Sequence, residues 1–182
     1  MQRIIVFGAS GSGKTTLGCW VAKQLEFPFI DLDDVYWNPG WVASTTAKFR
    51  AAVDDIARGS HWVIAGNYSQ ARDLLWPRAD TLIWLDIPLL QVLWRTTARA
   101  WRQSRSGELI CNGNRQALSA LIRGPDSLLG YTLRTYHARR LELPNILRLP
   151  QHCHARVIHL RHVSEVSAWQ KNFQPGKTPV ER

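Results

Sequence analysis

The chain has 182 residues, 45% of them hydrophobic, which is enough for one domain with a core that needs no disulfide bonds. Its three cysteines, Cys19, Cys111 and Cys153, are scattered and form no C-x-x-C pair, which predicts a reducing, cytoplasmic location. The first apolar run is too short for a signal peptide and Asp86 interrupts a later one, so the sequence predicts neither secretion nor a membrane span.

The net charge of +9 is concentrated in one part of the chain. Residues 95–161 contain 12 arginines, no lysine and three acids, whereas basic and acidic residues cancel elsewhere. Arginine favours planar, two-point binding of phosphate. The stretch therefore predicts a phosphate-bearing partner, either the polyphosphate of a nucleotide or the backbone of a nucleic acid.

In chain order, a short strand over residues 4–7 leads into a glycine-rich loop and then a helix. The loop reads GASGSGKTT and fills the pattern G-x-x-x-x-G-K-[ST], whose backbone N–H groups surround a phosphate at the positive end of the helix. Lys14 is predicted to reach the β- and γ-phosphates and Thr15 to hold Mg²⁺, with Thr16 a weaker candidate. The predicted nucleotide-binding residues of the loop are Gly8, Ser10, Gly11, Ser12, Gly13, Lys14, Thr15 and Thr16.

A second strand is predicted over residues 27–32, and three acids, Asp31, Asp33 and Asp34, lie at its end. Acids at the carboxyl end of a strand lie where open α/β sheets bind ligands. The alternation of a strand predicts Asp31 and Asp33 on one face and Asp34 on the other. Asp33 can then accept a proton from an attacking hydroxyl or join the Mg²⁺ shell. A helix cap or a turn acid is an equal alternative for each of the three.

An aromatic loop follows, with Tyr36, Trp37 and Trp41 within six residues. It offers a stacking wall for a base or a sugar, although simple packing of the rings is the more common arrangement. An amphipathic helix is predicted over residues 44–58, and its Arg50 can reach a substrate.

Two further strands are predicted over residues 61–65 and 81–86. The first is followed by a polar turn that contains Asn67, and Arg72 lies on the segment after it. Ala65 occupies the position at which P-loop proteins often keep an acid for magnesium, which weakens a simple assignment of the Mg²⁺ ligands.

The helix predicted over residues 88–105 carries Arg95, Arg99 and Arg102 at positions i, i+4 and i+7, hence on one face. Like charges stacked in this way destabilise a helix unless an anion joins them, so they indicate a phosphate ligand, with a solvated basic face as the alternative. After it, residues 104–125 have little apolar periodicity and contain three glycines, as expected of a mobile flap. A helix to about residue 143, a strand over 156–160 and a helix over 163–173 complete the chain.

Strands that alternate with helices favour a parallel α/β sheet. The residues also resemble those of the nucleoside-monophosphate-kinase group of P-loop proteins, most closely the branch described as adenylate kinase-like or DNA-topology-modulation proteins. The stretches that carry this resemblance are residues 8–16, 32–41, 62–68 and 79–86.

The resemblance implies a P-loop NTPase fold with three α/β/α layers and a five-stranded parallel sheet of order 2-3-1-4-5. It further implies one kinase-like domain over residues 1–173, a mobile lid over about 103–125 and a loose tail over 174–182. Arg123 and Arg134 would face back across the lid, and Ala65 stands where the branch usually has Asp. If that acid anchors Mg²⁺, this chain uses Asp31 or Asp33 instead or works more slowly. The resemblance implies an acceptor near Asp33, Trp37, Asn67 and Arg72. The further candidates for acceptor binding are Asp34, Arg50 and Arg134.

The function predicted from these residues is that of an ATP-dependent phosphotransferase that uses MgATP and a small acceptor, either a nucleotide or a nucleoside. Lys14, Arg95 and Arg99 would neutralise the transferred phosphoryl group, Arg102 would bind the nucleotide and Asp33 would deprotonate the acceptor. The alternative is a nucleic-acid-binding P-loop ATPase or regulator of DNA topology, in which Trp94, Trp101 and Tyr131 stack on bases. An inactive nucleotide binder is a third possibility, because of Ala65.

Overall fold

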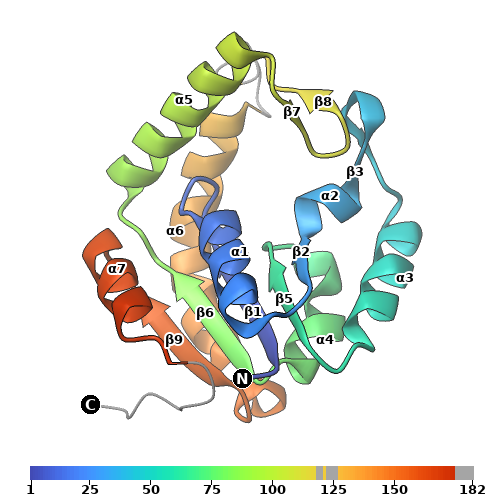
Figure 1. The fold of residues 1–182 in the computed structure, drawn as a ribbon, viewed down its shortest axis with the longest axis vertical. Helices are drawn as coiled ribbons and strands as arrows, with labels where there is room; N and C mark the ends of the chain where they lie inside the picture. Colours follow the sequence, from blue (N-terminus) through green and yellow to red (C-terminus); the bar gives the residue numbers. More distant parts are fainter. Residues whose placement is uncertain (118–120, 122–126, 175–182) are drawn as a thin grey trace.

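A computed structural model describes residues 1–117, 121 and 127–174 of the chain. Its centre is a five-stranded sheet in the order β2-β5-β1-β6-β9 (Figure 1). Every neighbouring pair is parallel. Counted along the chain, this is the predicted order 2-3-1-4-5, so the predicted sheet is confirmed. The strands are β1 (Arg3–Gly8), β2 (Phe29–Asp31), β5 (Trp62–Ala65), β6 (Thr81–Leu85) and β9 (Arg156–Leu160).

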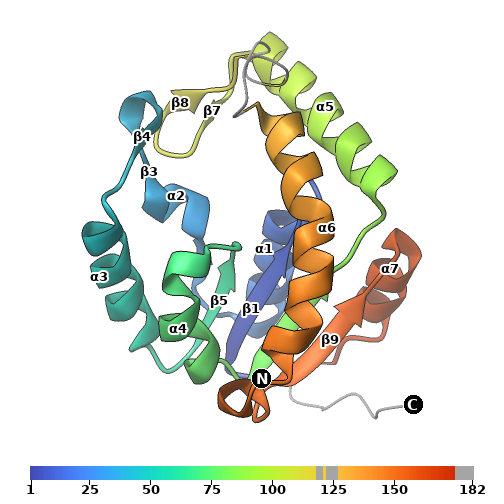
Figure 2. The same cartoon turned by 180° about the vertical axis from the view of Figure 1, so that it is seen from behind.

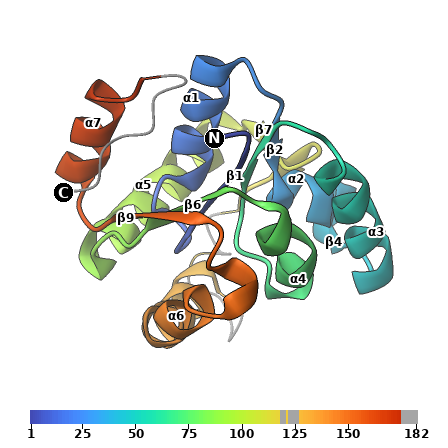
Figure 3. The same ribbon diagram turned by 90° about the horizontal axis from the view of Figure 1, so that it is seen from below.

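Helices cover both faces of the sheet, so the fold has the predicted three layers. Figure 2 shows α6 lying across one face, and Figure 3 shows α1 and α7 on the opposite side. None of the helices in the described part of the chain is both long and apolar enough to cross a membrane. The helices are α1 (Lys14–Leu25), α2 (Leu32–Tyr36), α3 (Thr46–Ala57), α4 (Arg72–Leu75), α5 (Leu89–Ser106), α6 (Leu128–Leu147) and α7 (Val163–Lys171).

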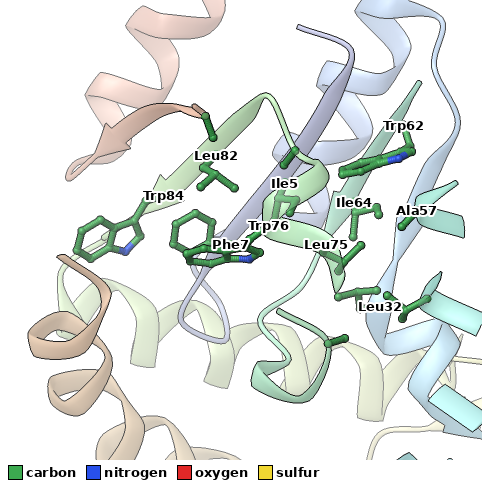
Figure 4. Packing of buried hydrophobic residues seen from close by; sticks show 14 of the residues in the cluster. Ile5, Phe7, Leu32, Ala57, Trp62, Ile64, Leu75, Trp76, Leu82 and Trp84 are labelled. Carbon is green, nitrogen blue, oxygen red and sulfur yellow. The ribbon is translucent and has the colours of Figure 1, made fainter. Parts of the chain in front are cut away.

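The alternation of side chains along the strands builds a separate core on each face. Ile5 and Phe7 of β1 point into a cluster with α3, α4 and α6, where Phe7 lies against Trp76 and Trp84 (Figure 4). Ile4 and Val6 point the other way, into a cluster with α1, α5 and α7. Because both faces of β1 are covered, its sequence is continuously apolar rather than alternating. The strand thus fixes the start of the glycine loop from both sides.

Two small antiparallel ladders extend beyond the carboxyl ends of the strands. One joins β3 (Trp37–Asn38) to β4 (Val42–Ala43) around the short 3₁₀ turn η1 (Pro39–Trp41). The other is the hairpin of β7 (Leu109–Ile110) and β8 (Asn114–Arg115), which lies within the stretch predicted as a lid. Of the predicted lid, residues 103–117 and 121 are described and the others are not. Arg123 and most of the predicted tail also lie outside the described residues.

Two boundaries differ from the sequence-based expectation. Helix α2 begins at Leu32, so Asp33 and Asp34 are helical and the predicted alternation of the acids between strand faces is wrong. Asp31 accepts a hydrogen bond from the backbone N–H of Asp33 and so ends the strand by capping a helix. Helix α6 passes through Pro144 and ends at Leu147 rather than near 143, because Ile146 and Leu147 pack on the same core as Leu143.

Candidate active site

The glycine loop between β1 and α1 has the backbone geometry of a phosphate cradle. Gly11 and Gly13 have φ angles of 78° and 99°, and Gly13 caps the N-terminus of α1 in the left-handed region. A Cβ at Gly11 would contact the Thr96 hydroxyl and would lie 2.8 Å from the carbonyl oxygen of Val92. The loop therefore packs closely beneath α5, and its turns need residues without a side chain.

Two polar side chains of this loop are arranged for an anion. The buried Ser12 Oγ has no hydrogen-bond partner among the described residues, and Lys14 Nζ donates to the Ala9 carbonyl across the loop at 3.0 Å. Burial lowers the pKa of Lys14, whereas the charges of Asp33 and Asp31 raise it. A bound phosphate would pair with the ammonium group and accept from the loop, so the residues fit the polyphosphate of a nucleotide. Thr16 is exposed in the first turn of α1.

Thr15 and Asp31 form a hydrogen-bonded pair of oxygen-bearing side chains beside the loop. Thr15 Oγ1 donates to Asp31 Oδ2 at 2.7 Å, while Asp31 Oδ1 accepts from the backbone N–H of Asp33 at 3.0 Å. Burial and the charge of Asp33 raise the pKa of Asp31. Hydroxyl and carboxylate oxygens are the donors that Mg²⁺ prefers, so this pair fits the ion. Asp31 also lies directly opposite Ala65 in the sheet, so it offers a carboxylate beside the position where one was expected.

Asp33, the predicted acceptor-side acid, has a partner that the sequence analysis did not single out. The Tyr68 hydroxyl donates to Asp33 Oδ1 at 2.6 Å. Burial and the negative charge of Asp33 raise the pKa of Tyr68, so the hydroxyl keeps its proton. Asp34 lies next to them on α2, and its pKa is raised by burial and by Asp33. The one sequence signal for Tyr68 is its place just after a buried strand, where sheet ligands gather.

The three arginines of α5 that were predicted to bind phosphate divide between two surfaces. Arg95 Nη1 donates to the Ser12 carbonyl at 3.5 Å, and Arg99 is close enough to Lys14 for its charge to lower the lysine pKa. Arg102 lies instead in a shallow groove on the outer side of α5, together with Trp94 and Trp101. The structure thus brings two of the three to the loop.

The predicted acceptor residues on the other side of the sheet have mixed surroundings. Arg50 forms a two-point ion pair with Asp73, both N–O distances being 2.7 Å, and it also donates to the Gln70 carbonyl. Arg72 lies over the Trp76 ring, 5.0 Å from its centroid. The side chains of Arg50 and Arg72 therefore already interact with other residues of the protein.

Asn67 lies beside Gly8 and Ala9, Trp37 lies in the aromatic loop after α2, and Arg134 is exposed on α6. Asn67 lines a small cavity beside the start of the loop, and its buried Nδ2 has no partner among the described residues. The half-buried Trp37 ring packs edge-on against Tyr36 and Trp41, with centroid distances of 5.0 and 5.6 Å. The rings of the aromatic loop thus pack on one another, which is the alternative to a stacking wall for a ligand.

The end of β6 holds α6 against the same cavity. Asp86 is almost fully buried, and its carboxylate pairs with Arg140 Nε at 2.9 Å and with His159 Nε2 at 3.2 Å. The Tyr136 hydroxyl donates to the Ile87 carbonyl at 3.0 Å. These contacts place Arg139 of α6 at the cavity, close enough for its charge to act on Lys14. Sequence reasoning left these residues out because the partners lie 49 to 73 positions apart.

The β7–β8 hairpin is bound to the α2–β3 segment (Figure 1). Asn112 Nδ2 donates to the carbonyls of Asp34 and Trp37 at 2.6 and 2.8 Å. Asn114 donates to the Asn38 carbonyl at 3.0 Å and accepts from the Trp41 backbone N–H at 2.8 Å. We call this set of contacts the hairpin latch.

The tip of the hairpin lies over the acids. Burial and the charges of Asp33, Asp34 and Asp31 raise the pKa of the Cys111 thiol to about 12. Cys111 and Asn112 have φ angles of 41° and 62°, so the turn is in the left-handed region. The hairpin thus covers the acid side of the site while α5 covers the phosphate loop.

The phosphate loop at the end of the first strand and the sheet order β2-β5-β1-β6-β9 show the P-loop fold that the sequence predicts. A model of the shikimate kinase family matches residues 10–39, which run from the loop past the acids. Threonine synthase-like 1 of Macaca fascicularis is 27% identical over 109 residues. That match covers 52% of this chain but 15% of the relative, so the chain spans a small part of that protein.

Solved structures share the fold over nearly the whole chain. A shikimate kinase from Acinetobacter baumannii in complex with shikimate has a TM-score of 0.55 at 19% identity, covering 94% of this chain and 90% of that one. A shikimate kinase from Bacteroides thetaiotaomicron has a TM-score of 0.54 at 18% identity, covering 93% and 94%. A gluconokinase from Sinorhizobium meliloti 1021 has a TM-score of 0.50 at 18% identity, covering 94% of both chains. These similarities establish the fold.

Proposed function

We propose that the protein is an ATP-dependent phosphotransferase that moves the γ-phosphoryl group of MgATP to a hydroxyl of a small acceptor. The observation that carries this proposal is the hydrogen-bonded series Thr15–Asp31–Asp33, which joins the phosphate loop directly to an acid on the acceptor side. A simple nucleotide binder has no need of that connection. The three free thiols support the prediction that the protein acts in the cytoplasm.

The residues of this series, together with Lys14 and two arginines of α5, have separate roles in the proposed reaction. Lys14, Arg95 and Arg99 would neutralise charge on the transferred group, and Mg²⁺ held by Thr15 and Asp31 would supply further positive charge. Asp33 would take the proton as the acceptor O–H bond breaks. The acceptor oxygen then bonds to the γ-phosphorus, the bond from that phosphorus to the bridging oxygen breaks, and ADP leaves.

For the acceptor, we propose a small polyhydroxylated molecule ahead of the predicted nucleotide or nucleoside. Arg50, counted among the acceptor ligands, is already paired with Asp73, whereas Asp33, Asp34 and Tyr68 present oxygen atoms that suit hydroxyl groups. The similar kinases are named for shikimate and gluconate, which are hydroxylated acids. A nucleoside monophosphate would bring about two negative charges toward these acids, whereas the carboxylate of a hydroxylated acid brings one.

The test is a phosphoryl-transfer assay with MgATP, in which mass spectrometry follows a panel of hydroxylated acids, sugars, polyols, nucleosides and nucleoside monophosphates. A product heavier by one phosphoryl group, formed by the wild type and lost in Lys14→Ala, would identify the reaction and the acceptor class. Thermal unfolding of the variant serves as the control for folding. Slow ATP hydrolysis that no member of the panel accelerates would contradict the proposal.

The outer side of α5 supports a second candidate function, the binding of single-stranded nucleic acid. Trp94 and Trp101 are 72% and 52% exposed, and they share their groove with Arg102 and Arg105 but with no acid among the described lining residues. Aromatic rings with arginines can stack on bases and neutralise the backbone. Fluorescence anisotropy with a labelled single strand would show binding that falls steeply as salt increases and that is lost in a Trp94→Ala/Trp101→Ala variant. Binding that does not depend on salt would contradict it.

A further inference from the structure

Tyr68 lies where the chain returns from β5 to the acid side of the site. The turn before it is fixed, because the Gly66 N–H donates to the Val6 carbonyl at 3.1 Å. Gly66 has a φ of 150°, and a Cβ there would lie 2.7 Å from the Cβ of Leu32, the first residue of α2. The turn therefore packs directly on the helix that carries Asp33.

The ring of Tyr68 is held by two neighbouring rings. Its centroid lies 4.8 Å from that of Tyr36 on α2 and 5.0 Å from that of Phe49 on α3. Tyr36 and Phe49 also contact each other edge-on at 5.3 Å. Packing on two sides leaves the ring little freedom, so its hydroxyl is directed at one point.

That point is Asp33 Oδ1, 2.6 Å away. The backbone N–H of Asp33 is held at the same time by Asp31 Oδ1 at 3.0 Å. The acid is thus fixed at its backbone and at one carboxylate oxygen, whereas no hydrogen bond to Oδ2 is found among the described residues. The charged groups around this carboxylate are Lys14, Asp31 and Asp34, with the neutral Cys111 above it.

We propose that Tyr68 is a positioning residue that holds the Asp33 carboxylate in the orientation needed to take the acceptor proton. This inference rests on the proposed function. Tyr68 donates to one carboxylate oxygen and leaves the other to the acceptor hydroxyl. Burial keeps the phenol protonated, so the hydrogen bond persists through the reaction. Productive transfer needs a donor group and a base in a fixed geometry, and small misplacements slow it strongly.

The variant that tests this is Tyr68→Phe, which removes the hydroxyl and keeps the ring between Tyr36 and Phe49. A hydrogen bond to a charged group contributes enough for us to expect kcat for transfer to fall about tenfold or more. KM for ATP should change by less than about threefold, because the Tyr68 hydroxyl donates to Asp33 rather than to the phosphate loop. Tyr36→Phe is the matched control: it removes a hydroxyl from the same ring cluster and should leave kcat near the wild-type value.

A double variant shows whether Tyr68 acts by positioning Asp33 or only by packing in the ring cluster. If Tyr68 acts through Asp33, then Tyr68→Phe should add no further loss to Asp33→Asn, so the two effects are not additive. A full additional loss in the double variant, or a wild-type kcat in Tyr68→Phe, would overturn the inference, as would equal losses in Tyr68→Phe and Tyr36→Phe. These results require that the wild type transfers phosphate. Failure of the wild type to transfer to any acceptor would overturn the proposed function as well, so the two failures are distinguishable.

Discussion

The phosphate loop and the acid side of the site are held in different ways. The loop takes its shape from backbone angles at Gly11 and Gly13 and from the strand and helix on either side of it. The acid side is assembled from side chains far apart in the sequence. Tyr68 reaches Asp33 across 35 positions, and Asn112 reaches the segment that contains Asp34 across 75 and 78 positions.

This difference suggests a division of labour. A local loop can bind the same polyphosphate in many proteins, because its ligands are backbone N–H groups. A surface joined by long-range side-chain contacts can change with few substitutions and without loss of the fold. We therefore expect changes in the loop to affect ATP binding and the whole reaction, and changes at Asp33, Tyr68 and the hairpin latch to affect transfer to the acceptor alone.

The largest effect is expected from Lys14→Ala. Removal of the loop ammonium should lower phosphoryl transfer by about a hundredfold to a thousandfold, because the charge that develops on the transferred group loses its main partner in the loop. Initial rates with saturating acceptor measure this. Lys23→Ala, at the other end of α1, is the control and should be active. A Lys14→Ala rate equal to that of the wild type would contradict the role of the loop.

The next effect is expected from Gly11→Ala. The new Cβ would contact Thr96 and would lie 2.8 Å from the Val92 carbonyl oxygen, in a backbone region that L-residues disfavour. ATP affinity should fall by about tenfold or more. The matched control is Gly107→Ala, because Gly107 also has a positive φ of 64° but nothing lies within 4 Å of its Cβ position. Calorimetric ATP titration of both variants separates backbone strain from contact, and equal losses would contradict the close packing of the loop on α5.

A smaller and more selective effect is expected from Asn112→Ala. The change removes two hydrogen bonds of the hairpin latch, to the Asp34 and Trp37 carbonyls. Each such bond contributes modestly, so kcat/KM for the acceptor should fall by about tenfold while ATP affinity stays within about twofold. Gln116→Ala is the control, because Gln116 bonds to the adjacent Ala117 carbonyl. Equal losses for ATP and for the acceptor would show that the latch does not belong to the acid side.

The smallest effect is expected from the Arg50–Asp73 ion pair. Both side chains are partly exposed, at 36% and 61%, so the pair is a weak surface contact. We expect Arg50→Ala and Asp73→Asn each to leave acceptor KM within about twofold. A large rise in acceptor KM for Arg50→Ala, with none for Asp73→Asn, would show instead that Arg50 binds the acceptor, as its place on the predicted helix suggested.

The contrast between the local phosphate loop and the acid side, which is built from distant residues, also explains how much could be predicted from the sequence. The strand order follows from the resemblance and is confirmed, and the loop of residues 8–16 is recognisable because its signal is local. The helix-cap alternative holds for Asp31, whereas the strand-face argument for Asp33 fails because α2 begins one residue after Asp31. A run of four residues with three acids does not reveal where a strand ends and a helix begins.

The contacts that the sequence did not reveal are those between distant side chains. The bond from Tyr68 to Asp33, the burial of Asp86 against Arg140 and the hairpin latch depend on how the chain returns to the same edge of the sheet. Composition and spacing carry no information about such pairs. The ion pair of Arg50 with Asp73 is a further example, because an arginine on a predicted helix does not reveal which carboxylate it will contact.

The measurement that tests the account most directly compares ATP binding and phosphoryl transfer in Asp33→Asn. The substitution keeps the shape of the side chain and removes the base. We predict that the dissociation constant for ATP stays within about threefold of the wild-type value, while transfer to the acceptor falls by about a hundredfold or more. Transfer at the wild-type rate would contradict the role of Asp33, and a parallel loss of ATP affinity would contradict the division of the site into a phosphate loop and an acid side.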